Sequence, residues 1–562
     1  MRLQPACTMR AMRRPVMCAR PLAVVLAALA VVSLGAQQRA PGLESIRQED
    51  LRADLFFLAG DAMRGRLTDT VENVATGDYI RARFERAGLK PAAPGGSYFQ
   101  NYHLMTATLG EGNGLEVTGA GGGTQRFAHG QEFYPQRFSA SGTAAGPVVF
   151  AGFGITAPTL GYDDYAGDVS GKIVLILDHE PGERDPKSPF DGVVTSEPST
   201  PWRKALAAQT RGAVGVLFVA DVHNHPAPVN FEQAARTVWP ATPPHLKTYT
   251  LASWADRLHI PAAQISPALA DSLVAGSGKT LAALAASAET ARGLPPVALP
   301  GTRVALTTSV VRHTIPDRNV VGIIEGSDPA LKDQWVLVTA HFDHNGTEGT
   351  QIYNGADDNG SGTVALLEIA DAYAEAARAG RRPKRSVLFA AWNSEERGLL
   401  GAWAYTEAPL APLASIVAVL NMDMVGRNEE VQAGGGPRFN GLDVQTAESN
   451  ANTLNMMGAS RAPDVATAMQ AANAGIGLTL LPRYENNASN LLRRSDQWPF
   501  LQRGVPALGF MTGLHPDYHT VYDRPEKINY PKMEKIARLV YQASWDLANA
   551  AGRPAHAKEI VR

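Results

Sequence analysis

The sequence predicts a mixed α/β protein: a mainly parallel sheet covered by helices on both faces, with a smaller α/β domain inserted in it. Three observations indicate this. A chain of 562 residues exceeds the size at which one hydrophobic core usually stops growing. Short β-rich runs occur between about residues 146 and 265. From about residue 303, apolar strand candidates alternate with long helical patterns, as in sheets that helices cover on both sides.

The first 36 residues have the pattern of a secretory signal peptide. A basic stretch precedes the apolar run "LAVVLAALAVVSLGA", which ends in small residues near Ala36. The run is too short for a comfortable membrane span, so we expect cleavage near Ala36 rather than an uncleaved anchor. We therefore expect a protein exported to the periplasm or the extracellular space, without a membrane partner after cleavage.

Composition describes the mature chain as an ordinary soluble protein without disulfides. Hydrophobic residues make up 45% and charged residues 19%, and both cysteines, Cys7 and Cys18, lie before the apolar run. The net charge of -2 includes five arginines and no acids from residues 1–36, so the remainder carries -7. A mildly acidic chain without a long basic run predicts no nucleic-acid partner.

The mature chain divides into three parts. Residues 44–89 show helical spacing, and a Pro/Gly-rich stretch follows them. Strand candidates at 146–155, 171–179 and 212–221, with a helical segment at 200–213, indicate a compact α/β unit. In the last part, strand candidates at 334–341, 385–393, 415–423 and 505–513 accompany helical patterns at 360–380 and 531–552.

Polar side chains follow each strand candidate of the last part. His341 and Asp343 follow the first, Glu395 and Glu396 the second, Asp423 the third, and His519 comes beyond the fourth. An acidic pair, Asp357 and Asp358, precedes the helical pattern at 360–380. In open α/β sheets, ligands bind outside the carboxyl ends of the strands.

Each of these side chains alone is more often structural, as a hydrogen-bonded histidine, a turn or a solvated face. Together, two imidazoles and four carboxylates at one sheet edge would repel one another without a cation. Nitrogen and oxygen ligands without thiolate suit zinc, with manganese or cobalt as lesser candidates.

The motifs "HFDH", "GADDNGSG", "NSEERGLLG", "NMDMVGR" and "YHTVYD" resemble, in order, those of the M28 zinc aminopeptidases, which are two-zinc exopeptidases. The resemblance covers roughly residues 303–550, and residues 44–105 look like the family's N-terminal portion. It implies a zinc-exopeptidase-like fold, two Zn²⁺ ions and peptide substrates. The expected boundaries are a signal peptide at 1–36, peptidase parts at 40–138 and 301–562, and an insertion at 139–300.

The resemblance also implies a role for each site residue. Asp357 would bridge the two metal ions and would be joined to Asp358 by a cis peptide bond. Glu396 and His519 would complete one site, and His341 and Asp423 the other. Asp343 would orient the His341 imidazole, as partners of metal-bound histidines do. Glu395 would be the general base that takes a proton from a metal-bridging water.

Two further segments resemble known modules. "VSGKIVLI" and "KALAAQTRGAVGVLFV" resemble a protease-associated domain, which would act as a lid or as a purely structural insertion. The segment 494–510 resembles a region near the family's active-site mouth, with Gln497 where the family often has histidine. Trp498, Phe500 and Tyr484 are candidates for an apolar specificity pocket or for plain core.

Three functions remain open at this point. The first is a secreted zinc aminopeptidase, which "NMDMVGR" and "EERGLLG" favour. The second keeps the same centre in a carboxypeptidase or a glutaminyl cyclase-like enzyme; a carboxypeptidase needs a cationic anchor, for which Arg427, Arg493 and Arg494 are candidates. The third is a binding module with an inactive centre, which would have no use for a spare Glu395.

Overall fold

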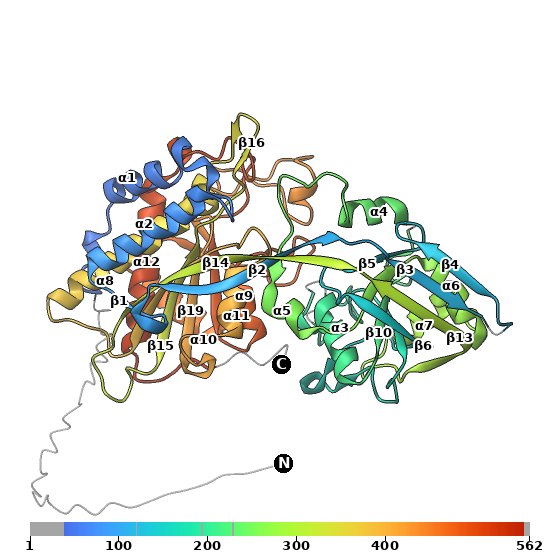
Figure 1. Ribbon diagram of the computed structural model, residues 1–562. Coiled ribbons are helices and arrows are strands. Elements are labelled where there is room, and N and C mark those ends of the chain that lie inside the picture. The colour runs from blue at the N-terminus through green and yellow to red at the C-terminus, as the bar shows by residue number, and fades with distance from the viewer. Residues whose placement is uncertain (1–38, 120, 191, 193–194, 228–229, 556–562) are drawn as a thin grey trace, which may run out of the picture. The chain divides into compact units, whose positions relative to one another are not determined.

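Four parallel strands form the centre of the larger sheet in this computed structural model (Figure 1). They are β18 (Ser386–Trp392), β15 (Trp335–His341), β19 (Ile416–Met422) and β22 (Ala507–Met511), in that spatial order. Val338 of β15 pairs with Phe389 on one side and Leu420 on the other. All four lie where the sequence predicts strands, so the prediction of a mixed α/β fold is confirmed.

The structure describes residues 39–119, 121–190, 192, 195–227 and 230–555. The expected signal peptide at 1–36 lies outside these residues. Among the helices of the described part, none is long and apolar enough to cross a membrane.

The sheet extends on both sides of the central strands, mostly through antiparallel pairs. On the β18 side follow β14 (Val310–Ile324), β2 (Phe99–Leu109) and β11 (Thr250–Leu251), and the short β1 (Lys90–Pro91) pairs with β14. On the β22 side follow β20 (Thr453–Met457), which is antiparallel to β22, and β21 (Thr479–Pro482). The sheet is therefore parallel in its centre and mixed at its margins.

Helices cover both faces of this sheet because its strands are apolar on both sides. Val336 and Val338 belong to one hydrophobic cluster and Leu337 to another, as the alternation of side chains along a strand requires. The first cluster packs against α1 (Gln48–Leu58), α2 (Val71–Ala87), α8 (Gly362–Arg378), α10 (Pro463–Asn473) and α12 (Tyr530–Asn549). The second packs against α9 (Leu400–Glu407) and α11 (Gln497–Gln502).

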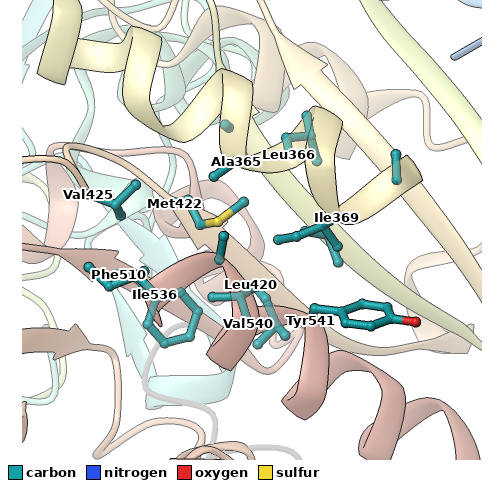
Figure 2. Packing of buried hydrophobic residues seen from close by; sticks show 14 of the residues in the cluster. Ala365, Leu366, Ile369, Leu420, Met422, Val425, Phe510, Ile536, Val540 and Tyr541 are labelled. Carbon is teal, nitrogen blue, oxygen red and sulfur yellow. The ribbon is translucent and has the colours of Figure 1, made fainter. Parts of the chain in front are cut away.

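Figure 2 shows the first cluster where α8, β19, β22 and α12 meet. Ile369 of α8, Leu420 of β19 and Val540 of α12 point toward one another there, and all are fully buried. Helix α2 begins and ends at conventional signals: the Thr70 side chain accepts from the N–H of Asn73 at its start, and Gly88 ends it in the left-handed region. This packing fixes the strand ends that carry the site.

A second sheet of eight strands has its own cores. Its order is β4 (Thr124–Ala128), β3 (Gly114–Thr118), β13 (Val297–Thr308), β6 (Gly142–Phe150), β9 (Ile173–Leu177), β10 (Gly215–Val219), β12 (Ala262–Ile265) and β5 (Phe133–Pro135). The pairs from β6 to β12 are parallel. The helices along this part of the chain are α3 (Pro201–Thr210), α4 (Phe231–Val238), α5 (Ala252–Arg257), α6 (Pro267–Val274) and α7 (Leu281–Ala288).

The second sheet extends beyond residues 139–300, and the expected insertion over that range stays a prediction. Strands β3, β4 and β5 come before residue 139, and β11, inside that range, pairs with β2 in the larger sheet. Backbone pairing between strands determines which residues belong to the second sheet. The strands at residues 114–135 are short and have little apolar pattern, so their sequence alone does not predict them. The likeness to a protease-associated domain stays a prediction.

Candidate metal centre

The centre lies at the carboxyl ends of the four parallel strands. His341 is the last residue of β15, Glu395 follows β18 by three residues, and Asp423 follows β19 directly. His519 lies in the segment after β22, and the acidic pair lies in the turn Ala356–Ser361 that precedes α8. Parallel strands end at one edge, so chain segments far apart in sequence deliver their polar side chains to one place.

The first group of potential ligands consists of His341, Glu395 and Asp423, all buried. The Nε2 atom of His341 lies 3.3 Å from Asp423 Oδ1 and 3.7 Å from Glu395 Oε2. The donor atoms of this group all lie within 4.8 Å of one another, close enough to hold one metal ion.

The second group consists of His344, Asp358, Glu396 and His519. His519 Nε2 lies 2.9 Å from Asp358 Oδ2 and 3.3 Å from Glu396 Oε2. His344 Nδ1 lies 2.6 Å from Glu396 Oε1. The sequence interpretation had assigned no role to His344, although it closes the "HFDH" motif three residues after His341.

Asp358 connects the two groups. Its Oδ2 atom belongs to the second group, whereas its Oδ1 atom lies 3.4 Å from His341 Nε2 in the first. The structure therefore places Asp358, and not Asp357, in the position expected of a bridging carboxylate. The cis peptide bond likewise joins Asp358 to Asn359, not Asp357 to Asp358 as expected.

Asp357 points away from both groups and holds neighbouring segments. Its Oδ1 accepts from the Gly426 N–H at 2.6 Å and from the Ser361 hydroxyl at 3.1 Å. Its Oδ2 lies 3.2 Å from His515 Nε2. The two aspartates are adjacent and chemically identical, so only the backbone path of the turn decides which one faces the centre.

Asp343 lies beneath the centre. Its carboxylate accepts from the backbone N–H groups of Glu395 at 2.9 Å and Glu396 at 3.3 Å. Its Oδ1 is 3.7 Å from His341 Nδ1, and its backbone carbonyl is 3.2 Å from the same nitrogen. Asp343 thus contacts both the imidazole and the glutamate pair, and its orienting role stays a prediction.

The electrostatics of the centre fit metal cations. Burial raises the pKa of Glu395 well above its usual range. Burial lowers the pKa of His341, but the Glu395 and Asp423 carboxylates outweigh it and hold that pKa well above the ordinary value. Buried carboxylates in such number are unfavourable unless cations or protons compensate them. The donors are imidazole nitrogens and carboxylate oxygens, as in zinc sites.

A buried arginine supports the loops around the centre, and sequence reasoning missed it. Arg66 is 1% exposed and donates to the carbonyls of Phe342, Asn354 and Gly355, each at 2.8 Å. Phe342 follows His341 directly, and Gly355 precedes the acidic turn. Nothing in the local sequence "MRGR" distinguishes Arg66 from the exposed Arg64.

A small pocket opens beside the centre. Asp358, Glu395 and Asp423 line its polar side, together with His519. Its apolar side is lined by Met424, Met457, Leu491, Met511 and Leu514. Arg494 and Tyr518 also line it, and the Arg494 side chain donates to the Tyr518 hydroxyl at 2.9 Å.

The aromatic residues considered for a specificity pocket lie elsewhere. Trp498 and Phe500 belong to the second hydrophobic cluster, and the Tyr484 hydroxyl donates to Glu429 at 2.6 Å. Gln497 is buried, and its side chain accepts from Asn421 and donates to the Leu492 carbonyl.

Imidazoles and carboxylates clustered at the carboxyl ends of the parallel strands of an α/β sheet are an arrangement that suits metal-dependent hydrolysis. Residues 319–544 match Peptidase family M28, and this stretch carries all the residues of both groups. Over residues 319–544, the chain is therefore similar to peptidase family M28.

Similar curated proteins include two kinds of peptidase. The chain is 32% identical over 238 residues to a probable glutamate carboxypeptidase of Arabidopsis thaliana, across 40% of this chain and 30% of that protein. It is 38% identical over 122 residues to an aminopeptidase of Mus musculus, across 21% of this chain and 15% of that protein. Each match spans less than a third of the relative's length.

Among solved structures, an aminopeptidase from Aneurinibacillus sp. strain AM-1 is similar, with a TM-score of 0.46 and 17% identity. That similarity covers 92% of this chain and 96% of the other.

Proposed function

We propose that this chain is an exported zinc aminopeptidase that removes single amino acids from the N-terminus of peptides. The observation that carries this proposal is the position of Asp358 between two groups of imidazoles and carboxylates, with Glu395 beside it. Two metal ions about 3.5–4 Å apart need a shared ligand, and a carboxylate can supply it. Export rests on the sequence of residues 1–36.

The donor set supports two zinc ions. His341 and Asp423 would hold one ion, Glu396 and His519 the other, and Asp358 both; His344 lies close enough to the second to join it. When bound, the ions would polarise the peptide carbonyl and lower the pKa of a water molecule.

Glu395 is the group best placed to move protons. Its backbone is held by the Asp343 carboxylate, and its side chain lines the pocket beside Asp423. A carboxylate with a raised pKa accepts a proton readily near neutral pH. In the proposed reaction, Glu395 takes a proton from the attacking water and donates it to the leaving amine.

The lining of the pocket supports cleavage from the N-terminus. A free α-amine carries a positive charge, and the three carboxylates that line the pocket would attract it. The methionine and leucine side chains of the lining would receive an apolar first side chain. An acetylated amine would lose its charge and leave these polar groups unpaired.

A carboxypeptidase is the second candidate, and Arg494 favours it. Arg494 lines the pocket and could pair with a substrate carboxylate, as arginine does through two parallel hydrogen bonds. The similarity to a probable glutamate carboxypeptidase points the same way.

One set of substrates distinguishes the candidates, with metal-analysed protein. We expect cleavage of free dipeptides, leucine amide and leucine anilide, little cleavage of N-acetylated dipeptides, inhibition by chelators and restoration by zinc. A carboxypeptidase would instead cut acetylated peptides and spare amidated ones, which would refute the proposal. Conversion of glutaminyl amide to a cyclic product without peptide cleavage would show a glutaminyl cyclase-like enzyme.

Arg494→Met adds an independent measurement. The aminopeptidase proposal predicts a kcat/KM for leucine amide within a few-fold of the wild type. If Arg494 anchors a substrate carboxylate, the variant would lose about 10- to 100-fold in kcat/KM toward peptides with a free carboxyl end, since a charged hydrogen bond contributes about 1.5–3 kcal/mol.

A further inference from the structure

A third group of potential ligands lies apart from the candidate centre, in the part of the chain that carries the second sheet. It consists of His179, Glu183 and His225. Glu183 lies between the two imidazoles: one carboxylate oxygen is 2.8 Å from His179 Nδ1 and the other is 2.5 Å from His225 Nε2. The imidazole centroids are 4.5 Å apart.

The group occupies a position typical of ligand sites in α/β sheets. Strands β9 and β10 are parallel neighbours, and β9 ends at Leu177, two residues before His179. His225 lies in the turn that follows β10. Directly after β9, the N–H of Asp178 donates to the carbonyl of Val219, the last residue of β10, at 2.8 Å, which holds the ends of the two strands together.

A hydrogen-bond frame holds the two ligand-bearing segments in register. The Glu289 carboxylate accepts from the Gly182 N–H at 2.8 Å and from the Asn224 side chain at 2.6 Å. Asn224 also donates to Asp221 at 2.8 Å. Gly182 adjoins Glu183, and Asn224 adjoins His225, so the frame limits the motion that would separate the ligands. Binding an ion would then require little further ordering.

The chemistry of the group suits a transition-metal cation. Two imidazoles and one carboxylate are the protein ligands of a common kind of zinc site, whose fourth position is taken by water. Ligand atoms around a tetrahedral zinc ion lie about 3.3 Å apart, given bonds of about 2.0–2.1 Å. The donor atoms here lie within 4.8 Å of one another, so small side-chain adjustments bring them to such an ion.

Without a metal ion, the same three side chains would be held together only by hydrogen bonds and by their own charges, which is less favourable than binding a metal ion. Two cationic rings on one carboxylate would repel each other across 4.5 Å, whereas two neutral rings would each donate an N–H to it and leave its negative charge without a cation. At neutral pH an imidazole is mostly neutral unless its surroundings favour the charge. One divalent ion satisfies the carboxylate and both neutral rings at once.

We propose that His179, Glu183 and His225 bind a zinc ion that links the segment after β9 to the turn after β10. The site joins two neighbouring strand exits and is independent of the proposed peptidase centre. Entry is open, because the two imidazole side chains are 46% and 45% exposed and Glu183 is 13% exposed.

Histidine footprinting tests this proposal on the mature, full-length protein. The protein, freed of metal by a chelator, is treated with diethyl pyrocarbonate with and without zinc, and modified histidines are located by peptide mass spectrometry. We expect zinc to protect His179 and His225. His223 is an internal control, because it is exposed in the same turn and does not belong to the group. Equal modification of His225 with and without zinc would overturn the proposal.

Metal counting on variants provides the second measurement. His225→Ala should bind one zinc ion fewer per chain than the wild type, and His223→Ala should bind as many as the wild type. Because His225 is exposed, its loss should leave the fold intact, which circular dichroism checks. An unchanged zinc count in His225→Ala would contradict the site.

The same counting separates this site from the peptidase centre. Glu396→Ala should lose zinc from the centre and keep the ion that His225→Ala removes. If the centre bound no metal at all, the difference between wild type and His225→Ala would still be one ion. The two proposals therefore fail independently.

Discussion

Removing the Arg66 guanidinium should destabilise the protein markedly, because this buried cation joins three segments around the candidate centre. Its Nη1 donates to Leu58 at the end of α1 at 2.7 Å, in addition to the carbonyls of Phe342, Asn354 and Gly355. Arg66→Met would leave four carbonyls without this donor. The end of α1, the segment after His341 and the segment before Asp358 would then lose a shared donor.

The expected magnitude follows from two opposing terms. Hydrogen bonds from a charged donor contribute about 1.5 kcal/mol each at the low end, or about 6 kcal/mol for the four. Burial lowers the pKa of Arg66 to about 10 from 12.5. At about 1.4 kcal/mol per pKa unit, this shift corresponds to a cost of about 3 kcal/mol for burying the charged guanidinium. Arg66→Met avoids that cost. Arg66→Met should therefore lower the free energy of unfolding by about 3 kcal/mol.

Urea unfolding followed by tryptophan fluorescence measures this difference at fixed zinc concentration. Arg64→Met is the matched control: Arg64 also has a positive φ, but its side chain is 54% exposed, and it pairs with Glu72 at 3.4 Å. We expect the control to change the free energy of unfolding by about 0.5 kcal/mol or less. Arg66→Lys, which keeps the charge, should fall between them. Equal unfolding midpoints for Arg66→Met and Arg64→Met would refute the reasoning.

Three further predictions concern carboxylates. Glu395→Gln should keep the metal content and reduce kcat by about 100-fold or more, whereas Glu396→Ala should lose metal; the reverse pattern in metal analysis would exchange their roles. Asp358→Asn should lower the metal content more than Asp357→Asn, and equal losses would contradict the placement of Asp358. Burial raises the pKa of Asp164 to about 6 from 3.8, so the folded state binds this proton more tightly. The contribution of Asp164 to the free energy of unfolding is then fully present below about pH 3.8 and is lost as the pH rises through about 6. Relative to Asp164→Asn, the wild type should lose about 3 kcal/mol of unfolding free energy across this range. A difference in unfolding free energy between the two proteins that does not change with pH would show that Asp164 does not titrate there.

Periodicity and residue type made the main elements predictable. Continuous apolar runs such as the one that ends at His341 are typical of strands buried on both faces, and the amphipathic pattern at 531–552 forms α12. The short strands at 114–135 escaped prediction because their stability comes from pairing with strands distant in sequence, β3 with β13 and β5 with β12. Local sequence does not contain that information.

For the site, the sequence by itself determined which chemistry was possible: imidazoles and carboxylates follow successive strands, and parallel strands bring their ends to one edge. Only the tertiary structure decided which of two identical neighbours faces the centre. Asp357 and Asp358 are adjacent in one turn. The Asp523 carboxylate accepts from the backbone N–H groups of both, and the Gly426 N–H donates to the Asp357 side chain. These contacts fix the path of the turn, so that Asp358 faces His341. The same holds for Arg66, whose partners lie up to 289 residues away. A side chain's direction depends on where the fold carries its backbone, and that is a property of the whole packed chain.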